Sequence, residues 1–373
     1  MTNVTRTILT ILTALIAASC SNFGKAPYQG VLRVGVVGPM SGPYTSYGGQ
    51  MRYGVDQAME DINTHGGLLD HQLRLRAVDD RCDPKRAAAI AQALVEEKVA
   101  FVVGHFCSAA SIAAAPIYGQ AGIVMITPSS ADPALTDEAA AQGAKNVFRT
   151  IPREDMEGPA LARYVLANFR GQRIGVVRDE ANDRAGVVPS AIAALQAGGM
   201  IPIISEKINT GATDFSGAIA RLKAADIGVI VFGGRYQEAA LLLIEARRQG
   251  LNIVLGGGDT LATKEFWKLA GPAAEGTFMP LLPDPSNLLT AQHVAARLAR
   301  FGIDATGYTL RAYAAVQVFA EAAKRANSLD GAAVAKSLRQ GQYDTVIGTL
   351  SFDDKGDLRS PGYQVYVWHK GRY

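Results

Sequence analysis

The stretch Leu32-Arg33-Val34-Gly35-Val36-Val37-Gly38 is a short apolar run, rich in β-branched residues and interrupted by glycine. A run of this length and composition predicts a buried β-strand. Amphipathic and apolar segments then alternate along the chain. Helices are expected over 50–63, 84–98 and 108–120, and strands over 73–80, 100–105 and 123–127. Strands that alternate with helices in this way predict an α/β fold with a doubly wound parallel sheet.

The same alternation begins a second time after residue 150. Strands are expected over 173–178, 200–208, 227–233 and 252–256, with helices over 155–168, 184–197, 214–225 and 237–249. Two sets predict two lobes, which fits a chain of 373 residues. The last part is expected to be helical over 288–300, 308–326 and 332–339, with short strands near 348–352 and 363–370. These strands are expected to complete both sheets, which gives an N-terminal lobe of 31–148 plus 280–350 and a C-terminal lobe of 149–279 plus 351–373.

The N-terminus has the features of a secretory signal over residues 1–19. Arg6 precedes a short apolar run over 8–16, and the small residues Ala17-Ala18-Ser19 come directly before Cys20. The chain is therefore expected to be exported to the periplasm or the cell surface. Cys20 is a candidate for lipidation, and the alternative is a free thiol at the mature N-terminus.

Charge and hydropathy exclude two classes of partner. The 37 basic and 34 acidic residues give a net charge of +3 and form no run of one sign, so a nucleic-acid surface is not expected. No later stretch is apolar over the length that a bilayer requires. Membrane contact is expected only through a lipid at Cys20.

The sequence lacks the common motifs of catalysis. It contains no Gly-x-Ser-x-Gly, no His-Glu-x-x-His and no Gly-Lys-Ser/Thr. The loop from Gly35 to Gly42 follows a strand, but its glycine spacing differs from that of a dinucleotide-binding loop, and Pro39 removes a backbone N–H. The five histidines are scattered. We therefore expect a binding protein rather than an enzyme, with no cofactor and no metal.

Cys82 and Cys107 form an even pair within the folded region. In an exported protein such a pair first indicates a disulfide. The bridge would close a loop of about 25 residues and contribute about 3 kcal/mol in the chain-entropy model. A metal site is a weaker alternative, because only His105 lies nearby as a third ligand.

Ligands of open α/β sheets bind beyond the carboxyl ends of the strands, near helix N-termini. Ser108 and Ser129 follow two expected strands of the first lobe, and their hydroxyls suit a carboxylate. Asp259 follows a glycine turn in the second lobe and suits an ammonium group. Each residue has an alternative role: the two serines and Asp259 could be plain helix caps, and Tyr47 could serve packing alone.

Several motifs together resemble one family, the branched-chain amino-acid (leucine/isoleucine/valine) substrate-binding proteins of ABC importers. The resemblance covers about Leu32 to Trp368, with the motifs in the same order. The motifs are Val36-Val37-Gly38-Pro39-Met40-Ser41-Gly42, Tyr47-Gly48, Asp61-Ile62-Asn63, Gly66-Gly67, Asp79-Asp80, Cys82-Asp83-Pro84-Lys85, Gly104-His105-Phe106-Cys107-Ser108, Ile126-Thr127-Pro128-Ser129 and Asp353-Asp354-Lys355-Gly356-Asp357.

The resemblance implies a type I periplasmic-binding fold, in which two lobes joined by three crossovers close on a ligand. It implies that Cys82 pairs with Cys107. It also implies roles for the site residues: Ser108 and the segment from Ser129 to Ala131 hold a carboxylate, Asp259 holds an ammonium group, and Tyr47 lines the side-chain pocket. Phe106 belongs to the site through the motif that ends at Ser108. The expected partners are a small amino-acid-like ligand and an ABC permease, and a monomer is expected.

The sequence also departs from the family pattern at the expected pocket. Ala131 replaces a usual threonine and removes a hydroxyl, while Asp183 and Arg235 stand where aromatic residues are usual. Tyr236 could replace one of those aromatics. Leucine itself is therefore in question as the ligand, and Arg235 suggests a ligand with a second acidic or polar group, unless its side chain faces solvent. A ligand-binding sensor, or a diverged binder of another small molecule, is the alternative function.

Overall fold

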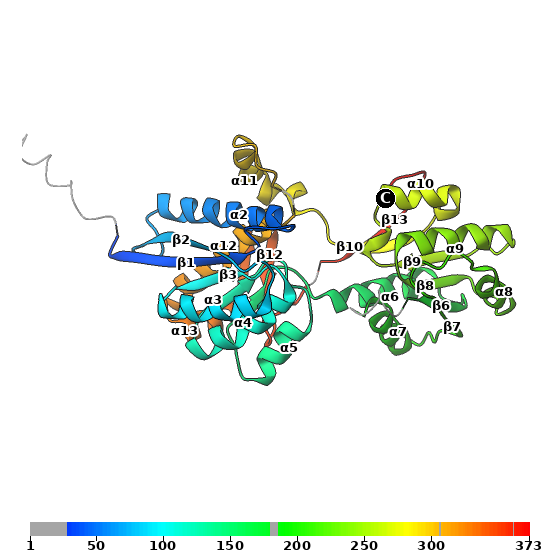
Figure 1. Ribbon diagram of the computed structural model, residues 1–373, viewed down its shortest axis with the longest axis horizontal. Coiled ribbons are helices and arrows are strands. Elements are labelled where there is room, and N and C mark those ends of the chain that lie inside the picture. The colour runs from blue at the N-terminus through cyan, green and yellow to red at the C-terminus, as the bar shows by residue number, and fades with distance from the viewer. Residues whose placement is uncertain (1–27, 180–185, 306, 361) are drawn as a thin grey trace, which may run out of the picture.

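A computed structural model describes residues 28–179, 186–305, 307–360 and 362–373. The predicted signal segment and Cys20 lie outside the described residues. Two α/β lobes lie side by side in Figure 1, and three segments of the chain pass between them. The predicted fold class, an α/β fold with two doubly wound lobes, is confirmed.

The first lobe is built on a five-stranded sheet with the order β2-β1-β3-β4-β5. All of its neighbouring strands are parallel. The strands are β1 (Gly30–Gly38), β2 (His71–Asp79), β3 (Phe101–Gly104), β4 (Val124–Thr127) and β5 (Val147–Arg149). The helices are α2 (Thr45–Thr64), α3 (Pro84–Glu96), α4 (Ser108–Ala121), α5 (Ala134–Ala141), α11 (Leu289–Ala299), α12 (Tyr308–Ala326) and α13 (Gly331–Gln340).

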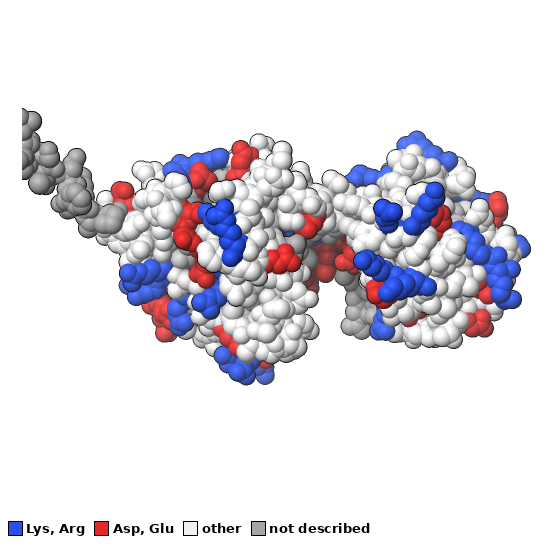
Figure 2. Space-filling model, turned by 90° about the horizontal axis from the view of Figure 1, so that it is seen from above, with Lys and Arg blue, Asp and Glu red and all other residues white. Residues whose placement is uncertain are grey.

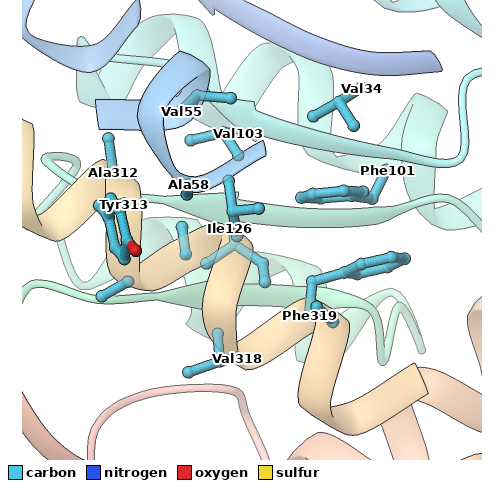
Figure 3. Close-up of a cluster of buried hydrophobic side chains, with 14 of the residues drawn as sticks. Val34, Val55, Ala58, Phe101, Val103, Ile126, Ala312, Tyr313, Val318 and Phe319 are labelled. Carbon is cyan, nitrogen blue, oxygen red and sulfur yellow. The ribbon is translucent and has the colours of Figure 1, made fainter. Parts of the chain in front are cut away.

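Both faces of this sheet are covered, which explains why β1 is apolar along its length. Val36 points into the core that α2, α12 and α13 cover, whereas its neighbour Val37 points into the core beneath α3 and α4. Phe101 of β3 stacks on Phe319 of α12 with ring centroids 3.7 Å apart (Figure 3). The last long helix of the chain therefore packs directly on the first sheet.

The second lobe has a six-stranded sheet with the order β13-β10-β9-β8-β6-β7. Its strands are β6 (Ile174–Arg178), β7 (Ile204–Lys207), β8 (Val229–Gly233), β9 (Val254–Gly257), β10 (Phe278–Leu281) and β13 (Gln364–Val367). The α-helices are α6 (Glu157–Asn168), α7 (Val187–Ala197), α8 (Ser216–Ala224), α9 (Tyr236–Arg248) and α10 (Lys264–Ala270). Short 3₁₀ helices are η1 (Glu154–Met156), η2 (Asp259–Leu261), η3 (Gly271–Ala274) and η4 (Pro285–Asn287).

The second sheet ends in one antiparallel strand, and one expectation about the tail is wrong. β13 is antiparallel to β10, because β10 leads out of the second lobe and β13 follows the chain as it returns. The tail also adds no strand to the first sheet. Instead β11 (Gln342–Thr345) and β12 (Gly348–Ser351) pair with each other as a separate antiparallel hairpin.

The three crossings fall near residues 150–156, 282–288 and 359–363. The lobe boundaries drawn from the sequence stay a prediction, but packing favours a later position for two of them. All of β10 belongs to the second sheet, and Phe352 and Leu358 pack on the core of the first lobe. Within the described ranges, no helix combines the length and apolarity that a bilayer crossing needs.

Candidate functional site

A cavity of about 650 Å³ lies between the two lobes. Its lining comes from strand ends of both lobes and from the crossing segments. Figure 2 shows a hollow between the lobes in which acidic side chains gather. The charged and polar residues that line the cavity are Ser129, Glu154, Glu157, Asp259, Thr260, Asp284, Tyr308, Arg311 and Tyr363, together with Ala131.

The first-lobe wall of the cavity is the loop that follows β4, and hydrogen bonds fix its shape. Thr127 Oγ1 donates to the carbonyl of His105 at 2.7 Å and accepts the N–H of Ser130 at 3.0 Å. Ser129 Oγ donates to the carbonyl of Phe106 at 2.5 Å. No described residue accepts the N–H of Ala131. Ser129 and Ala131 therefore line the cavity from a loop whose shape is fixed by hydrogen bonds. The N–H of Ala131 remains free to donate to a ligand.

Ser108 stands one layer behind this wall. It is the first residue of α4, and its side chain does not cap that helix. Ser108 Oγ instead accepts the N–H of Asp132 at 3.4 Å, which ties the two first-lobe loops together. In this conformation Ser108 is half-buried and does not line the cavity itself.

The predicted disulfide joins Cys82 to Cys107, with Cα atoms 5.4 Å apart. It fastens the residue before Ser108 to the loop after β2. A buried contact reinforces this connection, since His105 Nδ1 lies 2.7 Å from Asp80 Oδ2. The disulfide prediction is confirmed, and the bridge supports the loop that begins α4.

Three aromatic rings form a cluster beside the first-lobe wall. Tyr47 stacks on Phe106 at 5.0 Å between ring centroids, and both contact the ring of Tyr308, at 5.7 Å and 4.8 Å. Tyr308 lines the cavity, whereas Tyr47 and Phe106 lie behind it. Tyr47 therefore packs in the cluster and is also 38% exposed, so both of the roles considered for it remain compatible with its position.

Asp259 supplies an acidic group from the second lobe. It begins η2 directly after β9 and makes no side-chain cap. Its backbone N–H donates to Glu157 Oε1 at 2.8 Å. Water still reaches the residue, yet burial of the carboxyl raises the pKa of Asp259 above its ordinary value, against the lowering effect of the Thr260 N–H. Asp259 is therefore a carboxylate at the cavity wall that has no cationic partner among the described residues.

The remaining predicted residues lie apart from the cavity or outside the description. Arg235 is exposed immediately before α9. Tyr236 packs on the core of the second lobe. Neither residue lines the cavity in this conformation. Asp183 lies outside the described residues.

Sequence reasoning missed several cavity residues: Glu154, Glu157, Tyr308, Arg311 and Tyr363. Glu154, Glu157 and Tyr363 lie on or beside a segment that passes between the lobes, whereas Tyr308 and Arg311 lie in the first turn of α12. The search for strand ends could not find these residues. The position of the crossings could have indicated the first three, because a cavity between two lobes must be bounded by the segments that join them.

Two α/β lobes joined by three crossing segments, with a polar cavity between them, define a two-lobed ligand-binding protein. A family model described as "Periplasmic binding protein" matches residues 31–372. The chain belongs to the periplasmic binding protein family, as the sequence motifs predicted.

Individual relatives agree with this assignment. A Leu/Ile/Val-binding protein homolog 1 of Brucella melitensis is 36% identical over 363 residues, which cover 97% of this chain and 96% of the relative. A leucine-, isoleucine-, valine-, threonine- and alanine-binding protein of Pseudomonas aeruginosa is 33% identical over 372 residues, with 98% and 97% covered. The structure of an ABC transporter substrate-binding protein from Desulfitobacterium hafniense in complex with Leu has a TM-score of 0.71 and 26% identity, with 92% and 98% covered.

Proposed function

We propose that this chain is an exported substrate-binding protein that captures a small amino acid, or a related carboxylate, and delivers it to an ABC permease. One observation carries the proposal: the N–H of Ala131 in the first lobe, which no described residue accepts, and a carboxylate of the second lobe line the same cavity. These are complementary to the two charged groups of an amino acid.

The carboxylate of the ligand is assigned to the first lobe. The N–H of Ala131 is available there, whereas the Ser129 hydroxyl donates to the carbonyl of Phe106 and would have to turn to reach the ligand. The first turn of α4 lies beside them and presents N–H groups that no intrahelical carbonyl accepts. Ser108 would join the ligand when the lobes approach, since its hydroxyl already lies at the loop that carries Ala131.

The ammonium group of the ligand is assigned to Asp259. Desolvation of this carboxyl is unfavourable in the absence of a cation. A ligand ammonium would remove that penalty and would favour closure of the lobes, because the ligand's two charges contact opposite walls.

The test is a thermal-shift screen of amino acids and small carboxylates with the wild-type protein. At a ligand concentration of 100 times Kd, binding stabilises the folded state by about 2.7 kcal/mol. Asp259→Asn keeps the shape of the side chain and removes its charge, so we expect the best ligand to lose about 2 kcal/mol or more of binding free energy.

The matched control is Asp226→Asn, at an exposed second-lobe residue with a positive φ of 51°, which asparagine tolerates. It should bind as the wild type does. Unchanged affinity in Asp259→Asn would exclude the assigned role of Asp259, and no shift with any amino acid would exclude the ligand class.

Export, a lipid at Cys20, a monomeric state and the absence of catalysis are parts of the same proposal. They are supported by the sequence of the N-terminus and by the family. Mass spectrometry of the mature N-terminus tests the lipid: an acylated Cys20 is expected, and an unmodified thiol there would contradict it.

A further inference from the structure

Arg311 places an unpaired cation in the cavity. It lies in the first turn of α12, which begins after the second crossing. Its Nη1 donates to the carbonyl of Thr150 at 3.4 Å, the long limit of a hydrogen bond. No carboxylate of the described residues lies within ion-pair distance of its guanidinium.

Two other arginines of this protein that are partly or fully buried have carboxylate partners. Arg149 lies 2.7 Å from Asp357, and Arg153 pairs with Asp137, Asp155 and Asp357. Arg311 has no described carboxylate at such a distance, and desolvation lowers its pKa against a smaller opposing effect of Tyr308, Tyr363 and Asp284. A guanidinium stays charged in proteins. One that is partly removed from water and has no anionic partner therefore destabilises the fold, unless a ligand supplies the anion.

None of the acidic residues of the cavity forms an ion pair with Arg311 among the described residues, although Asp284 acts on it from a greater distance. Asp284 caps η4 by accepting the N–H of Ser286, and Glu157 accepts the N–H of Asp259. Glu154 and Asp259 remain. Burial raises the pKa of Glu154, and repulsion from Asp132, Asp155 and, to the smallest extent, Asp259 adds to the shift. Two carboxylates that repel each other suit one ammonium group, which would take the place of a protein cation between them.

The cavity thus contains one more charged group than a neutral amino acid can pair with. The α-carboxylate is provided for by the loop of Ser129 and the ammonium group by Asp259 with Glu154, so Arg311 remains for a third charge. Its planar fork of donors matches a carboxylate. Tyr308 and Tyr363 line the cavity with it, and the exposed Arg235 does not.

We propose that the ligand carries a second anionic group and that Arg311 binds it, which makes an acidic α-amino acid the preferred class of substrate. This inference rests on the proposed function, because it assumes that the amino-acid group is held as described above.

The experiment compares L-glutamate with L-glutamine, which differ in the charge of the side chain and little in shape. Calorimetric titration of the wild type should show glutamate binding more tightly, by about ten- to hundredfold. Arg311→Gln should remove most of that preference while leaving the affinity for glutamine nearly unchanged. Arg300→Gln changes an exposed first-lobe arginine whose side chain has no partner among the described residues, and it should keep the preference.

Unfolding of the ligand-free variants provides a second measurement. Arg311→Gln should unfold at the same temperature as the wild type or higher, because it removes a desolvated charge that no protein group pairs. If Arg311 instead stabilised the ligand-free fold, Arg311→Gln would unfold at a lower temperature than the wild type.

Two outcomes overturn the inference and leave the proposed function intact: glutamine binding the wild type as tightly as glutamate, or Arg311→Gln weakening both ligands equally. The second would place Arg311 at the shared α-carboxylate. Failure of every amino acid to bind would overturn the proposed function, and this inference with it.

Discussion

Asp357 connects two of the three crossings, and its replacement by asparagine should destabilise the first lobe. The residue lies just before the third crossing and is 3% exposed. Its Oδ1 lies 2.7 Å from Arg149 Nε and its Oδ2 lies 3.1 Å from Arg153 Nη1. Thr136 Oγ1 also contacts both oxygens, at 3.0 and 2.9 Å. Arg153 lies on the first crossing, so the carboxylate of Asp357 connects the first crossing to the start of the third.

The magnitude follows from what the change leaves behind. Asp357→Asn keeps the volume of the side chain but removes the charge that faces two cations. Arg149 would retain neutral acceptors, including the carbonyl of Ser130 at 3.0 Å, and Arg153 would retain Asp137 and Asp155. Removing one partner of a buried pair costs about 3–5 kcal/mol. Because the remaining acceptors reduce the loss, we expect the lower end, about 3 kcal/mol.

Urea unfolding can assign this loss to one lobe. Both tryptophans of the chain, Trp267 and Trp368, lie in the second lobe, so tryptophan fluorescence follows that lobe, whereas far-ultraviolet circular dichroism follows both. Asp357→Asn should shift the dichroism transition to lower urea. Asp354→Asn, at an exposed neighbour, is the matched control. Equal midpoints for the two variants would refute the argument.

Two further predictions concern the first lobe. Cys82→Ser with Cys107→Ser should lose about 3 kcal/mol of unfolding free energy in the chain-entropy model and should make stability insensitive to reductant; a stability equal to that of the oxidised wild type would contradict it. The Arg153 guanidinium lowers the pKa of Asp137 from 3.8 to about 2, so this pair stabilises the fold above pH 4 and the contribution disappears as the pH falls to about 2. Since Asp137 is 41% exposed, Asp137→Asn should cost only about 1 kcal/mol at neutral pH, and a loss that persists unchanged in acid unfolding below pH 2 would contradict the assignment.

The long buried strands and amphipathic helices could be predicted from sequence because one periodicity dominates each of them. Helix α12 has the predicted bounds, 308–326. The missed strands carry little signal: β5 has three residues, and β10 has four and includes Pro280. Such strands are held by their neighbours in the sheet rather than by local preference. The direction of β13 depends on the path of the chain between lobes, which no local pattern records.

The same division applies to the site. Ser129 and Asp259 could be predicted because both directly follow apolar strands, whose carboxyl ends face the cavity. Arg311 could not, since it begins a helix whose other face fills the first-lobe core, and its sequence neighbours indicate only that core. On the present proposal, strand-end loops hold the group that all amino acids share, whereas Arg311 at the start of α12 binds the group that distinguishes the ligand. The preferred ligand can therefore change through a substitution at Arg311 while the strand-end loops stay as they are.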